Sequence, residues 1–421
     1  MGEKQYIHIQ PMESFDVSKK KVLLRLDINS PINPVTKRIV NENRIDKSVS
    51  TLRWLMNQGA MVAIIAHQGD TLDYHNLIPL AEHAEKLSKK TKFDVRYIDD
   101  VCGPAAQEAI LALTPGSTVV LGNLRYLSEE VSTFEDVVKL TAEEGASTWL
   151  VRSLAPLFDL YINDAFAAAH RNAPSMVSFQ EVLPSGAGPL FQKEFSALTK
   201  VMNAPARPSV FILGGAKISD AFGMIEKVCE DRIADTILTV GVTGLVFLIA
   251  SGLDLGDNTL TFLEERNLQK FIPLAKKYLA AYPERIKMPS DLAFEVKGCR
   301  RETEIEELPG EAKYGDIGER TIAAYSEVLA RAGTIFINGP AGVFENRLFE
   351  QGTRELWLAA ASSTAFSVIG GGDSVSAAEC FTDLSNFSYV CTAGGAMVRF
   401  VSGKKLPLIK AMEKAYQRKK I

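Results

Sequence analysis

The N-terminal half of the chain carries arginine and histidine residues where an open sheet binds ligands. Apolar runs such as KVLLRLDIN (21–29) and MVAIIAHQG (61–69) predict buried parallel strands, and ligands bind outside the carboxyl ends of such strands. Guanidinium groups bind phosphate or carboxylate through paired hydrogen bonds, so arginines at one sheet edge predict an anion site. Any one of these residues alone could equally be a surface charge or a cap. The candidates at or near strand ends are Asp27, Asn29, Arg44, His67, Asn123, Arg125, Asn163, Asp164, His170 and Arg171.

The C-terminal half carries glycines after its apolar runs instead. Such glycines let backbone N–H groups and a helix N-terminus approach phosphate oxygens closely. Asp373 is placed to hold Mg²⁺, which prefers carboxylate and phosphate oxygens. Each loop alone could also be a tight turn, and Val375 stands where a dinucleotide-binding GxGxxG needs its last glycine. The loops are 214–217 (GGAK), 338–340 (NGP), 370–374 (GGGDS) and 394–395 (GG).

These two sets of residues differ in chemistry and lie in different halves of the chain. One domain would carry positively charged residues that bind an anion. The other would carry glycine-rich loops and an aspartate that bind a nucleotide. Two such sites that face each other predict phosphoryl transfer across a cleft. This chemistry depends mainly on positioning and charge neutralisation rather than on a covalent intermediate.

The scaffold that must position these residues is an alternation of strands and helices. Amphipathic stretches such as 46–58 and 319–332 separate the apolar runs, which is typical of βαβ units. The predicted class is α/β, with two doubly wound, Rossmann-like parallel-sheet domains. The segment LPSGAGP (183–189) indicates a boundary, and a helix is expected after it. Strands are expected within 21–29, 61–69, 117–125, 158–166, 209–217, 235–241, 334–340, 365–373 and 388–395.

The composition restricts the class of protein further. The 421 residues carry 47 basic and 51 acidic side chains, and this net charge of −4 argues against a nucleic-acid-binding protein. Five widely spaced cysteines indicate a reducing compartment, and the N-terminus has no signal-peptide pattern. The uncharged run 236–253 contains glycines and threonines that favour a buried strand, turn and helix over a membrane span. We therefore expect a cytoplasmic protein that binds no membrane.

The chain resembles phosphoglycerate kinases along nearly its whole length. The matching pieces, in the family's order, are LRLDINSPIN, NENRI, AHQG, GNLRYLSEE, YINDAFAAAHR, FILGGAKISD, YGDIGERT, NGPAGVFE, IGGGDS and CTAGGA. The resemblance implies reversible phosphoryl transfer between 1,3-bisphosphoglycerate and ADP, giving 3-phosphoglycerate and ATP with Mg²⁺. It also implies a hinge-bending enzyme. Its parts would be a 3-phosphoglycerate domain (1–185), a hinge and interdomain helix (186–205), a nucleotide domain (206–400) and a C-terminal segment that packs on the N-terminal domain (401–421).

The resemblance also assigns roles to individual residues. Arg44, Lys217 and Gly372 would be catalytic, and Asp373 would bind the metal ion. The 3-phosphoglycerate site would consist of Asp27, Asn29, Arg44, His67, Arg125, His170 and Arg171. The nucleotide site would consist of Gly215, Lys217, Gly241, Asn338, Pro340, Glu345, Gly371, Gly372, Asp373 and Ser374.

Two positions depart from the pattern of bacterial and eukaryotic members. Asp70 and Ala221 stand where those forms have basic residues, and in both respects the chain is similar to the archaeal branch. Smaller departures are Val240, Ala341 and Ala393. Two alternatives stay open: a related kinase for another small phosphorylated acid, which Asp70 keeps in view, and a non-catalytic nucleotide-binding protein. Retention of Arg44, Lys217 and Asp373 speaks against the latter. We expect a monomer or a weak homodimer.

Overall fold

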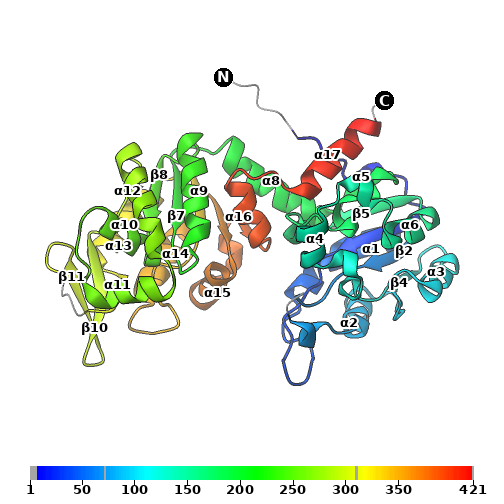
Figure 1. The fold of residues 1–421 in the computed structure, drawn as a ribbon, viewed down its shortest axis with the longest axis horizontal. Helices are drawn as coiled ribbons and strands as arrows, with labels where there is room; N and C mark the ends of the chain where they lie inside the picture. The colour runs from blue at the N-terminus through cyan, green and yellow to red at the C-terminus, as the bar shows by residue number, and fades with distance from the viewer. Residues whose placement is uncertain (1–6, 71–72, 309–311, 420–421) are drawn as a thin grey trace. The chain divides into compact units, whose positions relative to one another are not determined.

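The computed structural model describes residues 7–70, 73–308 and 312–419. The chain divides into two compact units, each with its own sheet (Figure 1). The N-terminal unit consists of Met1–Phe195 together with Lys405–Ile421, and the C-terminal unit is Ser196–Lys404. The division falls inside α8 (Pro189–Asn203), so one helix contributes residues to both units.

The N-terminal unit is built on six parallel strands in the order β3-β4-β2-β1-β5-β6. Side chains from α1 and α2 pack on one face of this sheet, and side chains from α3 and α6 pack on the other. Both faces are covered, which is why the central strands are continuously apolar. The strands are β1 (Lys21–Leu26), β2 (Met61–Ile65), β3 (Val95–Tyr97), β4 (Thr118–Val120), β5 (Leu160–Asp164) and β6 (Ser185–Ala187). The helices are α1 (Asn43–Asn57), α2 (Ala81–Thr91), α3 (Pro104–Leu111), α4 (Ser132–Val138), α5 (Ala142–Gly145), α6 (Trp149–Leu154) and α7 (Pro174–Val177).

The C-terminal helix α17 (Pro407–Lys419) returns to the N-terminal unit. Arg418 Nη1 lies 2.5 Å from Glu181 Oε2, and Lys414 pairs with Glu143. The backbone N–H of Leu408 donates to Ala169 O at 3.2 Å. The lysine-rich end of the chain is thus a helix whose charged side chains bind acidic residues of this unit.

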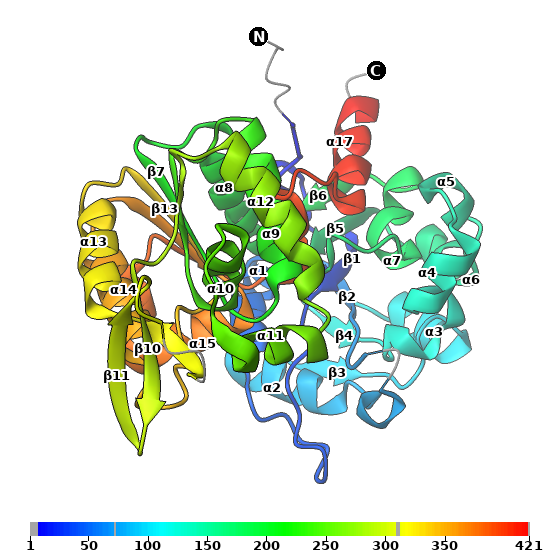
Figure 2. The same cartoon turned by 60° about the vertical axis from the view of Figure 1, so that its left-hand side comes forward.

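The C-terminal unit is built on a second sheet of six parallel strands, in the order β15-β14-β13-β7-β8-β9. Helices α9, α10 and α12 lie on one face and α13 and α14 on the other, as Figures 1 and 2 show together. The strands are β7 (Ser209–Leu213), β8 (Thr236–Thr239), β9 (Ile286–Lys287), β13 (Thr334–Asn338), β14 (Phe366–Gly370) and β15 (Tyr389–Cys391). The helices are α9 (Ile218–Glu230), α10 (Gly241–Ala250), α11 (Gly256–Glu265), α12 (Ile272–Ala281), α13 (Glu319–Ala330), α14 (Gln351–Ser362), α15 (Gly372–Phe381) and α16 (Gly395–Val401).

A small antiparallel sheet adjoins this unit's core. Its strands are β10 (Asp291–Val296), β11 (Cys299–Glu304) and β12 (Tyr314–Ile317), in the order β11-β10-β12. The sequence did not predict it, because CRRETE of β11 is polar and partly exposed rather than continuously apolar. Polar strands of this kind do not carry the pattern by which buried parallel strands are recognised.

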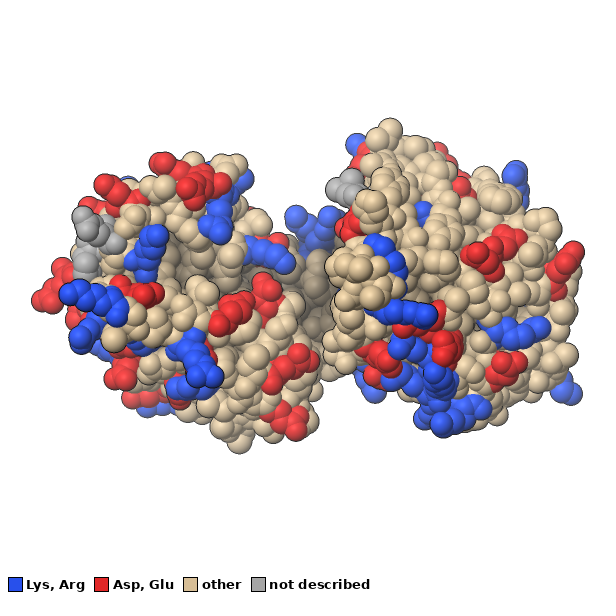
Figure 3. All heavy atoms as spheres, turned by 90° about the horizontal axis from the view of Figure 1, so that it is seen from below, with Lys and Arg blue, Asp and Glu red and all other residues tan. Residues whose placement is uncertain are grey.

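Each of the nine apolar runs contains a strand, and the doubly wound α/β class is confirmed. The run 236–253 forms β8 and α10, and no helix in the described parts of the chain is long and apolar enough to cross a membrane. Within the turn-rich segment 183–189, Ser185–Ala187 forms the edge strand β6 of the N-terminal sheet. Acidic and basic side chains are interspersed on the face of each unit that Figure 3 draws.

Candidate active site

The anion-site candidates of the N-terminal unit gather around the carboxyl ends of β1 and β2. Asp27 follows β1, and its carboxylate binds Arg44 of α1, with Arg44 Nη1 lying 2.6 Å from Asp27 Oδ2. His67 follows β2, and its Nδ1 lies 2.9 Å from Nη2 of Arg25. Because a guanidinium can only donate, His67 Nδ1 accepts and the ring hydrogen sits on Nε2. The imidazole therefore presents an N–H donor on its other side.

Arg125 and Arg171 converge on one short segment. Arg125 lies in the 3-10 turn Leu124–Tyr126 after β4, and its Nη1 donates to Glu130 O at 2.7 Å. Arg171 donates to the same carbonyl from Nη2 at 3.3 Å, and from Nε to Glu135 Oε1 at 2.8 Å. The Nε of Arg125 is buried with no hydrogen-bond partner among the described residues. The Arg125 guanidinium thus keeps hydrogen-bonding capacity that its described neighbours do not use.

Positive charge exceeds negative charge at this cluster. The pKa of His67 lies well below its ordinary value, first because the ring is buried and then because Arg25, Arg125, Arg171 and Arg44 surround it. Burial, with Arg171 next, lowers the pKa of Arg125 to about 10. Cations that disfavour one another's charge are stabilised by a multiply charged anion, because it attracts all of them.

The asparagines of the predicted site fix the turn that bears His67. Asn29 Oδ1 accepts from Gly69 N at 3.0 Å, and Asn123 Oδ1 accepts from Gln68 N at 3.1 Å. Asn123 Nδ2 returns a bond to Gln68 O at 2.9 Å. Asp70, at the next position, has an exposed side chain. The turn is therefore held by side-chain bonds from the segments that follow β1 and β4, the two strands that flank β2.

Asn163 and Asp164 do not join the cluster. Asn163 donates from Nδ2 to Tyr161 Oη at 2.7 Å and accepts from Ala165 N at 2.9 Å. Asp164 Oδ1 accepts from Phe191 N at 2.8 Å in the first turn of α8. Their hydrogen bonds are structural, whereas His170, which follows β5, is half-buried beside Arg171.

In the C-terminal unit, the loops after the neighbouring strands β7 and β13 bind one another through backbone groups. Gly214 N donates to Asn338 O and Gly215 N to Pro340 O, both at 2.9 Å. Gly215 has φ +71°, and a Cβ at Gly339 would overlap Gly214 O. Only glycines allow backbones this close. The loops after β7 and β13 are thereby locked together at the carboxyl edge of the sheet.

A cavity of about 610 Å³ opens beside these loops. It is lined by Gly215, Gly241, Pro340, Glu345 and Asp373, five of the ten predicted nucleotide-site residues. Its volume and mainly apolar walls suit a small organic ligand. The sequence missed the rest of the wall, which comes from α11, the antiparallel sheet and the loop after β13. These residues include Asn258, Thr259, Phe262, Leu292, Tyr314, Gly315, Val343 and Phe349.

The other nucleotide-site candidates lie around this cavity, and they differ in whether they are exposed or buried behind the loops. Lys217 is exposed at the N-cap of α9, and Gly372, the first residue of α15, has open space at its Cα. Asn338 and Ser374 are buried behind the loops: Asn338 Nδ2 donates to Gly370 O at 3.0 Å, and Ser374 Oγ accepts from Gly339 N at 2.6 Å. Gly371, with φ +92°, precedes α15. Lys217 and Gly372 thus present donors outward, whereas Asn338 and Ser374 support the loops.

The described residues contain no group of three or more side chains that would bind a metal ion alone. Asp373 is exposed in the first turn of α15 and lines the cavity. Mg²⁺ is commonly held by one or two carboxylates together with substrate phosphates and water. A single carboxylate at this position fits that mode of binding.

The sequence also missed Arg25 and Glu130. Arg25 is almost fully buried in β1, and the signal was one charged residue inside the apolar run KVLLRL. Glu130 is buried and accepts from Ser175 N at 2.7 Å and from Ser175 Oγ at 2.6 Å, and burial raises its pKa. Arg25 supports the cluster through its contact with His67, and Glu130 supports it through the carbonyl that accepts from Arg125 and Arg171.

Two doubly wound units, one with an arginine cluster at a sheet edge and the other with glycine-rich loops beside a cavity, are the arrangement expected of a two-domain phosphotransferase. The family model for phosphoglycerate kinase matches residues 12–404. The phosphoglycerate kinase of Methanothermus fervidus is 42% identical over 407 residues, covering 97% of each chain, and that of Pyrococcus furiosus is 38% identical over 411 residues, covering 97% of this chain and 98% of that one. The chain belongs to the phosphoglycerate kinase family.

Solved structures agree with this membership. The crystal structure of phosphoglycerate kinase from Pyrococcus horikoshii superposes with a TM-score of 0.87 at 35% identity, covering 97% of this chain and all of that one. The Coxiella burnetii enzyme gives 0.82 at 30% identity, covering 98% and 100%. The similarity to archaeal members that the motifs predicted is confirmed by the archaeal relatives. The chain is thus a phosphotransferase.

The electrostatics of His67 predict coupling between anion binding and protonation. Without ligand its pKa lies well below 6.5, so the ring stays neutral as pH falls through 6.5. A bound phosphate offsets the arginine charges, so 3-phosphoglycerate should raise this pKa. NMR titration of the His67 Cε1–Hε1 signal, assigned with His67→Gln, measures the shift. An unchanged pKa at saturating 3-phosphoglycerate would contradict the assignment of this cluster as the anion site.

Proposed function

We propose that the protein transfers a phosphoryl group reversibly between 1,3-bisphosphoglycerate and ADP, giving 3-phosphoglycerate and ATP, as in glycolysis and gluconeogenesis. The N-terminal cluster binds the phosphoglycerate and the C-terminal cavity binds the nucleotide. The observation that carries the proposal is the excess of arginine charge around His67, since a phosphorylated acid supplies two anionic groups to such a site.

Within the proposed substrate site, the residues divide into those that bind and those that position. Arg125, Arg171, His67 and His170 bind the substrate's anionic groups. Asp27 orients Arg44 through their 2.6 Å ion pair, and Asn29 fixes the His67 turn. Arg44 is the most exposed of the four arginines in the cluster, so it can swing onto the transferring group.

In the proposed nucleotide site, backbone groups carry most of the recognition. Gly241 borders the adenine, Pro340 lies against the nucleoside, and Glu345 reaches the ribose hydroxyls. The N–H groups at the start of α15, at Gly371, Gly372, Asp373 and Ser374, bind phosphate oxygens, because a helix N-terminus presents free donors and a positive dipole. Mg²⁺ held by Asp373 and the phosphates would neutralise part of the phosphate charge.

The proposed reaction is a direct displacement. In the direction of ATP use, a carboxylate oxygen of 3-phosphoglycerate bonds to the γ-phosphorus while the bond from that phosphorus to the β,γ-bridging oxygen breaks, releasing ADP. Lys217, Arg44 and the Gly372 N–H stabilise the charge on the migrating phosphoryl oxygens. The reacting atoms must approach closely, so we propose that bending within 186–205 closes the two units around their ligands.

We further propose a cytoplasmic enzyme that is monomeric or weakly dimeric. None of the five cysteines, all of which lie in the described parts of the chain, forms a disulfide, which supports a reducing compartment. A size-exclusion measurement at two protein concentrations distinguishes the two oligomeric states.

A coupled assay with ATP and Mg²⁺ tests the substrate assignment. The arginine cluster offers more cationic capacity than one carboxylate requires, so 3-phosphoglycerate should be turned over rapidly and glycerate negligibly. Rapid turnover of 2-phosphoglycerate in place of 3-phosphoglycerate would favour the related kinase that Asp70 left open. Equal rates with 3-phosphoglycerate and glycerate would refute the anion site.

Substitution of Lys217 tests the proposed catalytic cation. Ala221, one helical turn further on, offers no second charge, so Lys217 bears the stabilisation of the transferring group. Lys217→Ala should lower kcat by roughly 10²–10³, as loss of one preorganised charge-stabilising group does, with little change in nucleotide Kd. The exposed Lys276→Ala, in α12, is the control. A near-normal kcat with only a raised KM would show that Lys217 binds substrate without acting in catalysis.

A further inference from the structure

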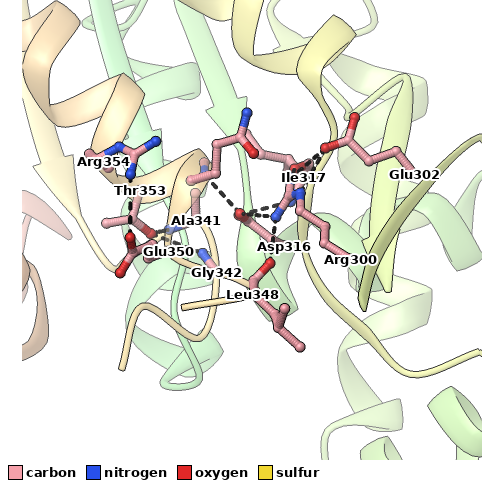
Figure 4. Close-up of polar contacts among 12 residues, drawn as sticks. Arg300, Glu302, Asp316, Ile317, Ala341, Gly342, Leu348, Glu350, Thr353 and Arg354 are labelled. Carbon is pink, nitrogen blue, oxygen red and sulfur yellow. Dashed lines mark hydrogen bonds and ion pairs between the residues drawn. The ribbon is translucent and has the colours of Figure 1, made fainter. Parts of the chain in front are cut away.

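Arg300 lies in the antiparallel sheet, yet its guanidinium reaches the loop that lines the cavity (Figure 4). Its Nη1 donates to Asp316 Oδ2 and to Leu348 O, each at 2.9 Å, and its Nη2 donates to Ile317 O at 2.8 Å. Its Nε donates to Glu302 Oε1 at 2.8 Å. The side chain is 15% exposed. One mostly buried cation therefore joins β11, β12 and the loop before α14.

Asp316 of β12 is the ion-pair partner of Arg300, and it also connects β12 to the chain around the start of α14. Its side chain is fully buried, and it accepts from Gly352 N at 2.7 Å and from Ile317 N at 2.9 Å. Burial raises its pKa to about 6 in spite of the adjacent guanidinium. A Cβ at Gly342 or at Gly352 would overlap this carboxylate, so both segments pack directly on it.

The loop between β13 and α14 is fixed at three places. Ala341 N and Gly342 N donate to Thr353 Oγ1, each at 3.1 Å, and Val343 N donates to Gly315 O at 2.9 Å. The third place is Leu348 O, which accepts from Arg300. Glu345 lies between the second and third places with its side chain exposed. Arg300 is thus the side chain that restrains the far limb of the loop.

We propose that Arg300 is a positioning residue for nucleotide binding: it holds the 343–349 loop against β12, so that Glu345 and the cavity wall keep the geometry that the nucleotide requires. This inference rests on the proposed function, because it takes the cavity as the nucleotide site. Arg300 does not line the cavity, so it acts through the loop rather than by touching the ligand. Planar guanidinium geometry is required, since four acceptors are bound at once.

The test compares steady-state kinetics of Arg300→Gln, Arg300→Lys and the control Arg320→Gln with those of the parent enzyme. Arg320 forms an exposed ion pair with Glu304 beside the same small sheet and does not reach the loop. We expect Arg300→Gln to raise the KM for ADP about tenfold or more, with the KM for 3-phosphoglycerate and kcat changed about twofold at most. The KM for ADP of Arg300→Lys should fall between that of the parent and that of Arg300→Gln. The KM for ADP of Arg320→Gln should match that of the parent.

Arg300→Gln also leaves Asp316 buried without its cation, which lowers stability by a separate route. The double variant Arg300→Gln/Asp316→Asn removes that charge. We expect its thermal midpoint to recover while the KM for ADP stays raised, because Leu348 O and Ile317 O still lack their donor. Recovery of both quantities would overturn the proposal, since Arg300 would then serve only to neutralise Asp316.

Glu345→Ala separates failure of this inference from failure of the proposed nucleotide site. If Glu345→Ala raises the KM for ADP and Arg300→Gln does not, the positioning role is wrong and the nucleotide site stands. If neither variant changes the KM for ADP, the cavity is not the nucleotide site and both proposals fail. If both variants raise it while the KM for 3-phosphoglycerate holds, both proposals are supported.

Discussion

Repulsion among arginines that share one buried neutral histidine is the constraint on which the N-terminal unit depends. Carboxylates offset part of the charge: Asp27 binds Arg44, and Glu135 binds Arg171. Burial, and after it the remaining positive charge, lowers the pKa of His67 and of Arg125. The fold tolerates this because these residues sit at or near the carboxyl edge of a parallel sheet, where an anionic ligand can complete the balance. An anion bound there would recover in affinity what the repulsion costs the free protein.

The C-terminal unit shapes its candidate ligand site with closely packed backbone rather than with charged side chains. Its glycine loops pack so closely that a side chain at Gly214, Gly339 or Gly241 would overlap a neighbouring backbone atom or side chain. The loops leave a cavity beside them. The backbone of these loops is held by hydrogen bonds to side chains such as Ser374, Thr353 and Arg300. Rigidity of the loops, supplied by these buried contacts, is what allows backbone donors to recognise a ligand.

The sequence predicted the fold class and the parallel strands because strands covered on both faces are continuously apolar. The edge strands β3, β6 and β9 escaped, and so did the antiparallel sheet, since CRRETE of β11 carries no such pattern. The position of residues at strand ends predicted an anion site that includes the arginine cluster, and it also included Asn163 and Asp164, whose side chains bind neighbouring backbone groups. Individual roles came from the resemblance. Arg25 and Arg300 were missed because their importance lies in long-range contacts that spacing does not encode.

In the proposed function, the arginine cluster binds the phosphoglycerate and the C-terminal unit binds the nucleotide. Isothermal titration of the parent enzyme and Arg125→Gln, each with 3-phosphoglycerate and with ADP and Mg²⁺, distinguishes the two sites. The affinity for 3-phosphoglycerate should fall about tenfold or more, as expected when a charge-assisted contact to an anion is lost, while the affinity for ADP stays the same. Unchanged binding of 3-phosphoglycerate, or an equal loss for both ligands, would contradict the account.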